Sequence, residues 1–102
     1  MLPLIDQHRA ELTALCRRYH VARLDVFGSA ATGEFDPARS DLDFLVEFRD
    51  LPAEQRFDTF FELQRALSEL FGRPVDLVEA DAPRNPYFLR RLNESRRPVY
   101  AA

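Results

Sequence analysis

The segment Leu24–Phe48, LDVFGSAATGEFDPARSDLDFLVEF, decides the fold of this chain. Apolar residues dominate its two ends, which predicts one strand over Val21–Phe27 and a second over Leu42–Phe48. Gly28 stops the first strand, and Ser29 is a favourable N-cap for a helical turn after it. Such a turn leaves backbone N–H groups free to bind an anion such as a phosphate. We therefore expect an anion site at the end of the first strand.

Two aspartates open the second strand. Side chains two residues apart point to the same face of a strand, so Asp41 and Asp43 lie together, while Leu42 and Phe44 point toward a covering helix. Two carboxylates roughly 7 Å apart repel one another unless a cation lies between them. Mg²⁺ is suited to this position because it prefers carboxylates, waters and substrate phosphates. A phosphate site facing a pair of metal-binding carboxylates is typical of nucleotide chemistry.

The rest of the chain predicts three helices and a third strand. The helices are expected at Ile5–Tyr19, Pro52–Phe71 and Pro86–Ser95, where apolar residues recur at helical spacing. A short apolar strand, Val75–Val78, contains Asp76. An aspartate inside a buried strand needs a partner or a metal ion, so this residue is a further candidate for the site.

The expected fold is a single α/β (α+β) domain over residues 1–102, a small mixed β-sheet covered by helices in the order α-β-α-β-α-β-α. No long crossover helix fits between the first two strands, so they are predicted to pair antiparallel. The long helix can return the chain for a parallel third strand. Its four phenylalanines are expected to pack against the sheet rather than to stack on bases.

Composition excludes several classes of protein. The chain is 46% hydrophobic and 30% charged, as in soluble globular domains, and no apolar run approaches the roughly 20 residues of a membrane helix. We expect a cytoplasmic protein without a membrane partner. A single cysteine, Cys16, excludes an internal disulfide and a cysteine-based zinc site. All 14 basic residues are arginine, which excludes a P-loop ATPase, and the net charge of −3 argues against direct nucleic-acid binding.

The C-terminal segment is cationic on this mildly acidic chain. It has one acid, Glu94, and five arginines: Arg84, Arg90, Arg91, Arg96 and Arg97. One interpretation is a solvated helix face. The other is a docking surface for a triphosphate, an RNA or an acidic partner, and it requires this segment to lie near Ser29.

These motifs together resemble the DNA polymerase β-type nucleotidyltransferase superfamily, and more narrowly its minimal nucleotidyltransferase (MNT) branch. The residues that carry the resemblance are Gly28-Ser29, Gly33, Ser40-Asp41-Leu42-Asp43 and Asp76, with Asn85-Pro86-Tyr87 before the basic helix. It covers nearly the whole chain. It implies a nucleotidyltransferase fold and the transfer of a nucleoside monophosphate from a nucleoside triphosphate, with ATP as substrate.

The resemblance also implies roles for individual residues. Gly28, Ser29 and Ser40 would bind the nucleotide. Asp41 and Asp43 would be catalytic and would ligate two Mg²⁺ ions. Asp76 would bind one of these ions and help to deprotonate the acceptor hydroxyl.

Minimal members of this branch are commonly encoded beside a HEPN ribonuclease toxin and act as its antitoxin by AMPylating a tyrosine. The resemblance therefore implies an adenylyltransferase with a HEPN toxin as partner. The chain has no residues for the closing helical domain of larger members, so a partner or self-association into a homo-oligomer is expected to complete the site. Two alternatives remain open: a non-catalytic antitoxin that binds stoichiometrically, and a nucleotidyltransferase acting on a small molecule or an RNA end.

Overall fold

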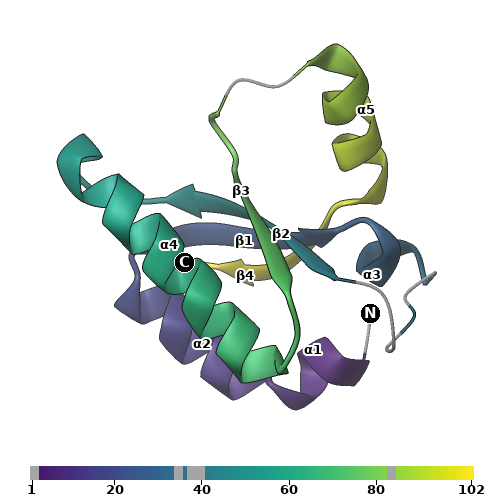
Figure 1. The fold of residues 1–102 in the computed structure, drawn as a ribbon, viewed down its shortest axis with the longest axis horizontal. Coiled ribbons are helices and arrows are strands. Elements are labelled where there is room, and N and C mark those ends of the chain that lie inside the picture. The colour runs from purple at the N-terminus through teal and green to yellow at the C-terminus, as the bar shows by residue number, and fades with distance from the viewer. Residues whose placement is uncertain (1–2, 34–35, 37–40, 83–84) are drawn as a thin grey trace.

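The computed structural model describes residues 3–33, 36, 41–82 and 85–102. Within these ranges the chain alternates helices and strands around one sheet (Figure 1). The elements in chain order are α1 (Pro3–Gln7), α2 (Arg9–Arg18), β1 (Val21–Phe27), α3 (Ser29–Thr32), β2 (Leu42–Phe48), α4 (Ala53–Phe71), β3 (Val75–Glu79), α5 (Pro86–Ser95) and β4 (Arg97–Ala101). No helix among the described residues has the length and apolar character needed to cross a membrane.

The sheet is mixed and has the strand order β3-β2-β1-β4. β1 and β2 pair antiparallel and β2 and β3 pair parallel, which confirms the predicted directions. β4 pairs antiparallel with β1 and was missing from the predicted order. It is a five-residue strand containing Pro98, and proline is tolerated there because β4 lies at the edge of the sheet.

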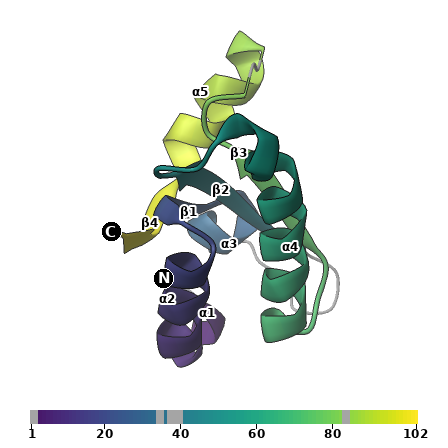
Figure 2. The same cartoon turned by 90° about the vertical axis from the view of Figure 1, so that its left-hand side faces the viewer.

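One face of the sheet is covered by α1, α2 and α4 and carries the main core (Figure 2). The strand residues on this face alternate along the chain, as Leu42 and Phe44 do. The buried side chains of this core are Ile5, Leu12, Cys16, Val21, Leu24, Val26, Ala30, Leu42, Phe44, Val46, Leu63, Leu67, Phe71, Val75, Leu77 and Val99. Burial raises the pKa of the Cys16 thiol to about 12, so this residue is an inert part of the core.

The opposite face carries α5 and a smaller apolar cluster (Figures 1 and 2). Its members are Phe27, Leu45 and Leu92, with Val78 and Phe88 packed against them. Because side chains alternate along each strand, the aspartates of β1, β2 and β3 belong to this face. The three are Asp25, Asp43 and Asp76. The sheet thus has an apolar face and a face on which carboxylates lie beside a small apolar cluster.

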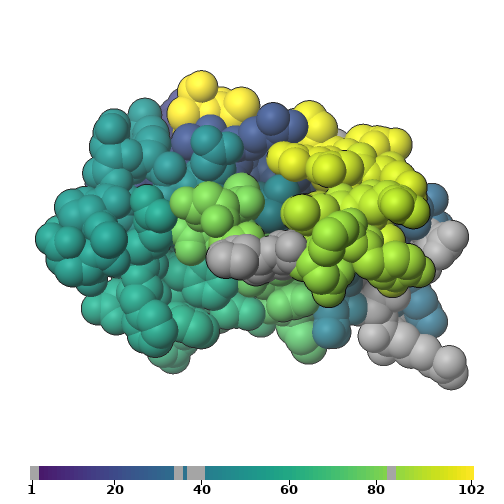
Figure 3. Space-filling model, turned by 90° about the horizontal axis from the view of Figure 1, so that it is seen from above, coloured from purple at the N-terminus to yellow at the C-terminus, as the bar shows by residue number. Residues whose placement is uncertain are grey.

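Two predictions about the helices were wrong in detail. The predicted leading helix Ile5–Tyr19 is divided at His8, whose Nδ1 is 2.9 Å from the Leu4 carbonyl oxygen and whose ring packs edge-on against Phe71. The α4 phenylalanines are not all core residues, since Phe57 is 70% and Phe61 is 50% exposed. The start of α4 stands at one end of the molecule (Figures 1 and 3). Phe57 and Phe61 line a second, open pocket there with Leu77 and Glu79 of β3.

Candidate active site

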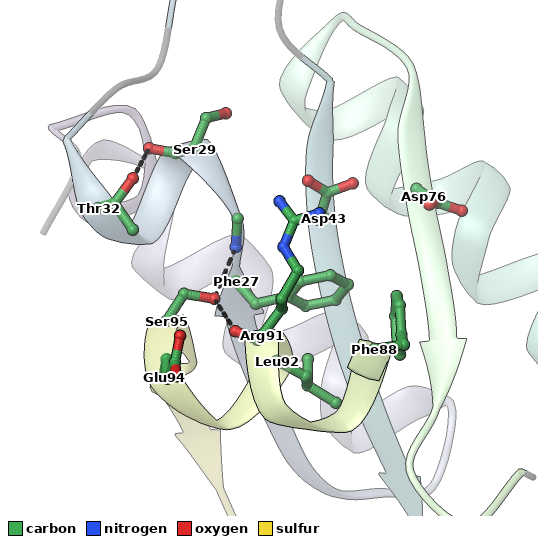
Figure 4. A pocket seen from close by; sticks show the side chains of 11 residues that line it. Phe27, Ser29, Thr32, Asp43, Asp76, Phe88, Arg91, Leu92, Glu94 and Ser95 are labelled. Atoms are coloured by element: carbon green, nitrogen blue, oxygen red, sulfur yellow. Dashed lines mark hydrogen bonds between the residues drawn. The ribbon is translucent and has the colours of Figure 1, made fainter. Parts of the chain in front are cut away.

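A pocket of about 450 Å³ opens between α3, the adjoining ends of β2 and β3, and α5 (Figure 4). It brings together four residues that the sequence assigned to the site: Gly28, Ser29, Asp43 and Asp76. The other residues of its wall are Phe27, Thr32, Phe88, Arg91, Leu92, Glu94 and Ser95. The predicted convergence of the Gly-Ser turn with two acids from different strands is therefore present.

The acids are placed by strand register. Asp43 and Asp76 are direct partners across the parallel β2–β3 ladder, so they point to the same face from strands roughly 4.8 Å apart. The pKa of Asp43 is raised to about 6, most strongly by burial and then by the charges of Asp76 and Asp41. Asp76 is exposed because β3 is an edge strand, which corrects the expectation of an acid inside a buried strand.

Asp41 lies directly before β2 and is exposed. It does not belong to the pocket wall, although its charge acts on the neighbouring Asp43. Ser40, predicted to bind the nucleotide, lies outside the described residues.

Position 28 requires glycine because of its backbone conformation and its closeness to Asp43. Its φ of 70° and ψ of −147° belong to a region that is essentially restricted to glycine. A Cβ atom built on Gly28 would lie 2.6 Å from Oδ2 of Asp43, too close for any other residue without displacing that carboxylate. Gly28 rather than Ser29 is the N-cap of α3, because the helical turn begins one residue earlier than predicted. The backbone of the turn therefore lies directly against the Asp43 side chain.

The Gly28 amide is not free in this structure. Its N–H donates to Ser95 Oγ at 3.2 Å, and the Ser95 hydroxyl donates to the Arg91 carbonyl oxygen at 3.1 Å (Figure 4). The expectation of free amides at the turn is therefore wrong for the N–H of Gly28. The hydrogen bond to Ser95 also joins the last turn of α5 to the turn that precedes α3.

The acid pair fits a magnesium ion that is completed by substrate. In the ranges 3–33, 36, 41–82 and 85–102, no group of three or more His, Cys, Asp or Glu side chains is arranged to hold a metal ion. Mg²⁺ is usually bound by one or two carboxylates together with waters and substrate phosphates, so three protein ligands are not required. Asp43 and Asp76 are oxygen donors on adjacent strands, facing a pocket large enough for phosphates.

A buried ion pair holds the junction of α5 and β4, and the sequence analysis did not identify it. Asp25 is fully buried in β1, and its Oδ1 accepts a hydrogen bond from Arg23 Nε at 3.0 Å. Its Oδ2 accepts a hydrogen bond from Arg96 Nε at 2.7 Å and forms an ion pair with Arg96 Nη2 at 2.6 Å. A charge this deeply buried is stable only when it is paired. A lone aspartate in the apolar run of β1 was the signal that could have revealed it.

No individual residue of α5 was predicted to belong to the site. The docking interpretation of the cationic segment required it to lie near Ser29, and this condition is met. Arg91 and Ser95 lie in the pocket that contains Ser29, so α5 does lie near the Gly-Ser turn. The signal was the Asn85 cap, which sets the phase of α5 by accepting a hydrogen bond from the Phe88 amide at 2.8 Å. With Phe88 and Leu92 packed on the sheet, Arg91 and Ser95 fall beside the pocket.

Comparison with known proteins places this chain among relatives along most of its length. A protein of Methanocaldococcus jannaschii, provisionally named a protein adenylyltransferase, is 41% identical over 89 residues, which are 87% of each chain. Protein adenylyltransferase MntA of Thermococcus cleftensis is 37% identical over 75 residues, which are 74% of this chain and 69% of the relative.

Solved structures share the fold. One provisionally described as a minimal nucleotidyltransferase has a TM-score of 0.73 and 31% identity, and the match covers 91% of this chain and 90% of that one. A toxin–antitoxin complex with AMP-PNP gives a TM-score of 0.69 at 20% identity, covering 92% and 73% of the two chains. The complex of tri-AMPylated Shewanella oneidensis HEPN toxin with MNT antitoxin gives 0.65 at 17% identity, covering 96% and 73%.

The family model for the nucleotidyltransferase domain matches residues 9–99, a range that begins with α2 and ends in β4. This range includes the Gly-Ser turn and the candidate site residues Asp41, Asp43 and Asp76. The chain belongs to the nucleotidyltransferase domain family and is a nucleotidyltransferase.

Proposed function

We propose that this protein transfers AMP from ATP, in the presence of Mg²⁺, to a tyrosine hydroxyl of a HEPN-type toxin and so acts as its antitoxin. The observation that carries the proposal is the Asp43–Asp76 pair, which faces one pocket together with the turn at Gly28 and Ser29. This arrangement combines cation-binding carboxylates with a backbone turn suited to phosphates.

In this proposal Asp41, Asp43 and Asp76 hold Mg²⁺, and the turn at Gly28 and Ser29 binds the β- and γ-phosphates. Bound Mg²⁺ would neutralise charge on the entering and leaving oxygens. The raised pKa of Asp43 supports this role, because a carboxylate destabilised by burial and by like charges gains most from a cation. Positioning and charge stabilisation, rather than covalent catalysis, then account for the rate.

At the α-phosphorus the reaction forms one bond and breaks one. The acceptor oxygen attacks the α-phosphorus, the bond from that phosphorus to the bridging oxygen breaks, and pyrophosphate leaves with that oxygen. The hydroxyl proton passes to a carboxylate, for which Asp76 is the candidate because it is exposed at the open edge of the pocket. An exposed base on an edge strand can be reached by a side chain that another protein carries.

The acceptor class is supported by the relatives rather than by the pocket. One relative is named protein adenylyltransferase MntA, and the fold is shared with an MNT antitoxin bound to an AMPylated HEPN toxin. The shared fold of the complex with AMP-PNP supports an adenine nucleotide as substrate.

The direct test is transfer of label from ATP labelled at the α-phosphate to a HEPN protein encoded beside this one. We expect labelled toxin with Mg²⁺ and none with EDTA, and a tyrosine-to-phenylalanine change in the toxin should remove the label. Asp43→Asn should lower the rate by at least about 10²–10³-fold. The matched control is Asp58→Asn, an exposed acid on α4 away from the pocket, which should keep full activity.

The same experiment separates transfer from stoichiometric neutralisation. If the double variant Asp41→Asn/Asp43→Asn protects cells from the toxin as well as the wild type does, at equal affinity for it, transfer is not the mechanism. Labelling of an RNA end or a small molecule in place of the toxin would reject the protein acceptor while retaining the transferase.

A further inference from the structure

The helix α5 is held in a defined orientation against the pocket. The side chains of Phe88 and Leu92 pack on Phe27, Leu45 and Val78 on the face of the sheet that carries the acids. The ring of Phe88 meets that of Phe27 edge-on, with centroids 6.3 Å apart. This packing fixes the rotation of α5 about its own axis, so Arg91, the residue before Leu92, faces the pocket.

The end of α5 is fixed as well. Ser95 Oγ accepts the hydrogen bond from the Gly28 amide, and the next residue, Arg96, pairs with the buried Asp25. These two contacts hold the helix against both β1 and the turn that begins α3. A side chain on the last two turns of α5 therefore has a fixed position relative to the Gly28–Ser29 turn.

Arg91 is the residue that this geometry directs into the pocket. Figure 4 shows its guanidinium reaching from α5 into the space between the α3 turn and Asp43. Among the described residues of the pocket wall, Arg91 carries the one positive charge, against the carboxylates of Asp43, Asp76 and Glu94. No carboxylate in the described part of the chain forms an ion pair with it.

We propose that Arg91 binds the polyphosphate of the nucleotide and holds the charge that develops on the departing pyrophosphate. The inference rests on the proposed function, since it assumes that a nucleoside triphosphate occupies this pocket. A guanidinium offers several N–H donors in a planar fork that matches phosphate oxygens, and its charge-assisted hydrogen bonds are stronger than neutral ones. The exposed position leaves the side chain free to meet an incoming anion.

The test compares two neighbouring arginines in the full chain. Arg90 is exposed on the same turn of α5 but is absent from the pocket wall, so Arg90→Gln removes an equal charge at nearly the same place. Binding of AMP-PNP and of AMP with Mg²⁺ is measured for the wild type, Arg91→Gln, Arg91→Lys and Arg90→Gln, with AMP measured by competition. Thermal unfolding of each variant identifies any loss of fold.

Arg91→Gln should weaken AMP-PNP binding by roughly 10- to 100-fold, the loss expected for a hydrogen bond to a charged group. AMP binding should change less than about threefold, since AMP lacks the β- and γ-phosphates, and Arg90→Gln should match the wild type. Arg91→Lys should recover part of the loss because it keeps the charge without the fork.

Three results would overturn the inference. Equal weakening of AMP-PNP and AMP would mean that Arg91 only supports the wall of the pocket. Equal effects of Arg90→Gln and Arg91→Gln would mean that general charge, rather than a contact, attracts the nucleotide. If Arg91→Gln binds AMP-PNP at the wild-type affinity, Arg91 makes no contact with the polyphosphate. A wild-type protein that binds no triphosphate would reject the proposed function together with this inference, whereas the other three outcomes leave the proposed function intact.

Discussion

The two faces of the sheet differ in what the same strands present. Toward α1, α2 and α4, β1 and β2 contribute only apolar side chains, among them Val26 and Phe44. Toward α5 the same strands contribute Asp25 and Asp43 beside a small apolar cluster. Burial on the first face supplies the hydrophobic stabilisation of the fold. The second face depends on that support, because it contains groups that cost stability unless they are paired.

The comparison shows that alternation along one strand can place the residues that stabilise the fold on one face of the sheet and the residues of the site on the other. A residue and its chain neighbour lie on opposite faces, so adjacent substitutions should have unlike effects. The predictions below test that separation, from the largest expected effect on stability to the smallest.

The largest effect is expected from Phe44→Ala on the apolar face. Phe44 is fully buried and stacks on Phe71 with ring centroids 5.9 Å apart. We expect a loss of about 3–5 kcal/mol in the free energy of unfolding, measured by urea denaturation. Asp43→Asn, one residue earlier, should lose activity without losing stability. Equal destabilisation by both substitutions would show that the faces are not separable.

The next effect concerns the buried charge on the other face. Arg96→Ala leaves Asp25 paired with Arg23 alone, so we expect a loss of about 3 kcal/mol in the free energy of unfolding. Arg90→Ala on exposed α5 surface is the control and should change it by less than about 0.5 kcal/mol. The double variant Asp25→Leu/Arg96→Met should recover most of the loss, since it removes the unpaired charge. Failure of Arg96→Ala to destabilise would mean that Arg23 suffices.

A smaller effect separates backbone strain from contact with the site. Gly28 and Gly72 have φ values of 70° and 65°, but a Cβ atom would meet Asp43 only at Gly28 and would find nothing within 4 Å at Gly72. Each substitution by alanine should lower the free energy of unfolding by about 1–2 kcal/mol through strain. Only Gly28→Ala should also lower transfer, by about 10²-fold, because it displaces Asp43. An active Gly28→Ala protein would contradict the close approach of turn and acid.

The smallest effect is the pH dependence of the protein without metal. The pKa of Asp43 is raised from 3.8 to about 6, so between these values the folded state binds more protons than the unfolded state. Stability should therefore fall as pH rises from about 4 to about 6, and Asp43→Asn should remove this slope. Mg²⁺ should raise Tm more above pH 6 than below it, because protons compete for the carboxylate. A Tm that is insensitive to Mg²⁺ at every pH would contradict the metal role.

Much of the fold followed from the sequence because its signals are local. The alternation from Leu42 to Phe48 identified the face of β2 that is buried, and the long helix before Val75 predicted a parallel third strand. The convergence of the Gly-Ser turn with the acids was expected from the motifs taken together and from the family resemblance, and the pocket contains Asp43 and Asp76 but not Asp41. The sequence did not specify the register that makes the two acids direct partners, since register depends on packing between strands.

The errors have physical reasons that no local pattern contains. Helical periodicity shows which side of α4 is apolar, but not that Phe57 and Phe61 stay exposed at an open pocket instead of entering the core. The place of α5 depends on the contact between Asp25 and Arg96, which are 71 residues apart in the chain. Arg91 was therefore visible only as part of a cationic segment, without a direction. The N-cap shifted to Gly28 because that residue adopts a conformation open to glycine.

If the turn binds the nucleotide as proposed, the hydrogen bond from the Gly28 amide to Ser95 would have to change when the phosphates bind. A phosphate oxygen that accepts a hydrogen bond from the Gly28 amide has to replace the Ser95 hydroxyl, which still donates to the Arg91 carbonyl oxygen. Nucleotide binding would then exchange one acceptor for another instead of leaving a donor unsatisfied, so little free energy would be lost at that atom. Release of product would restore the original contact, and the amide signal of this one glycine would report each turnover.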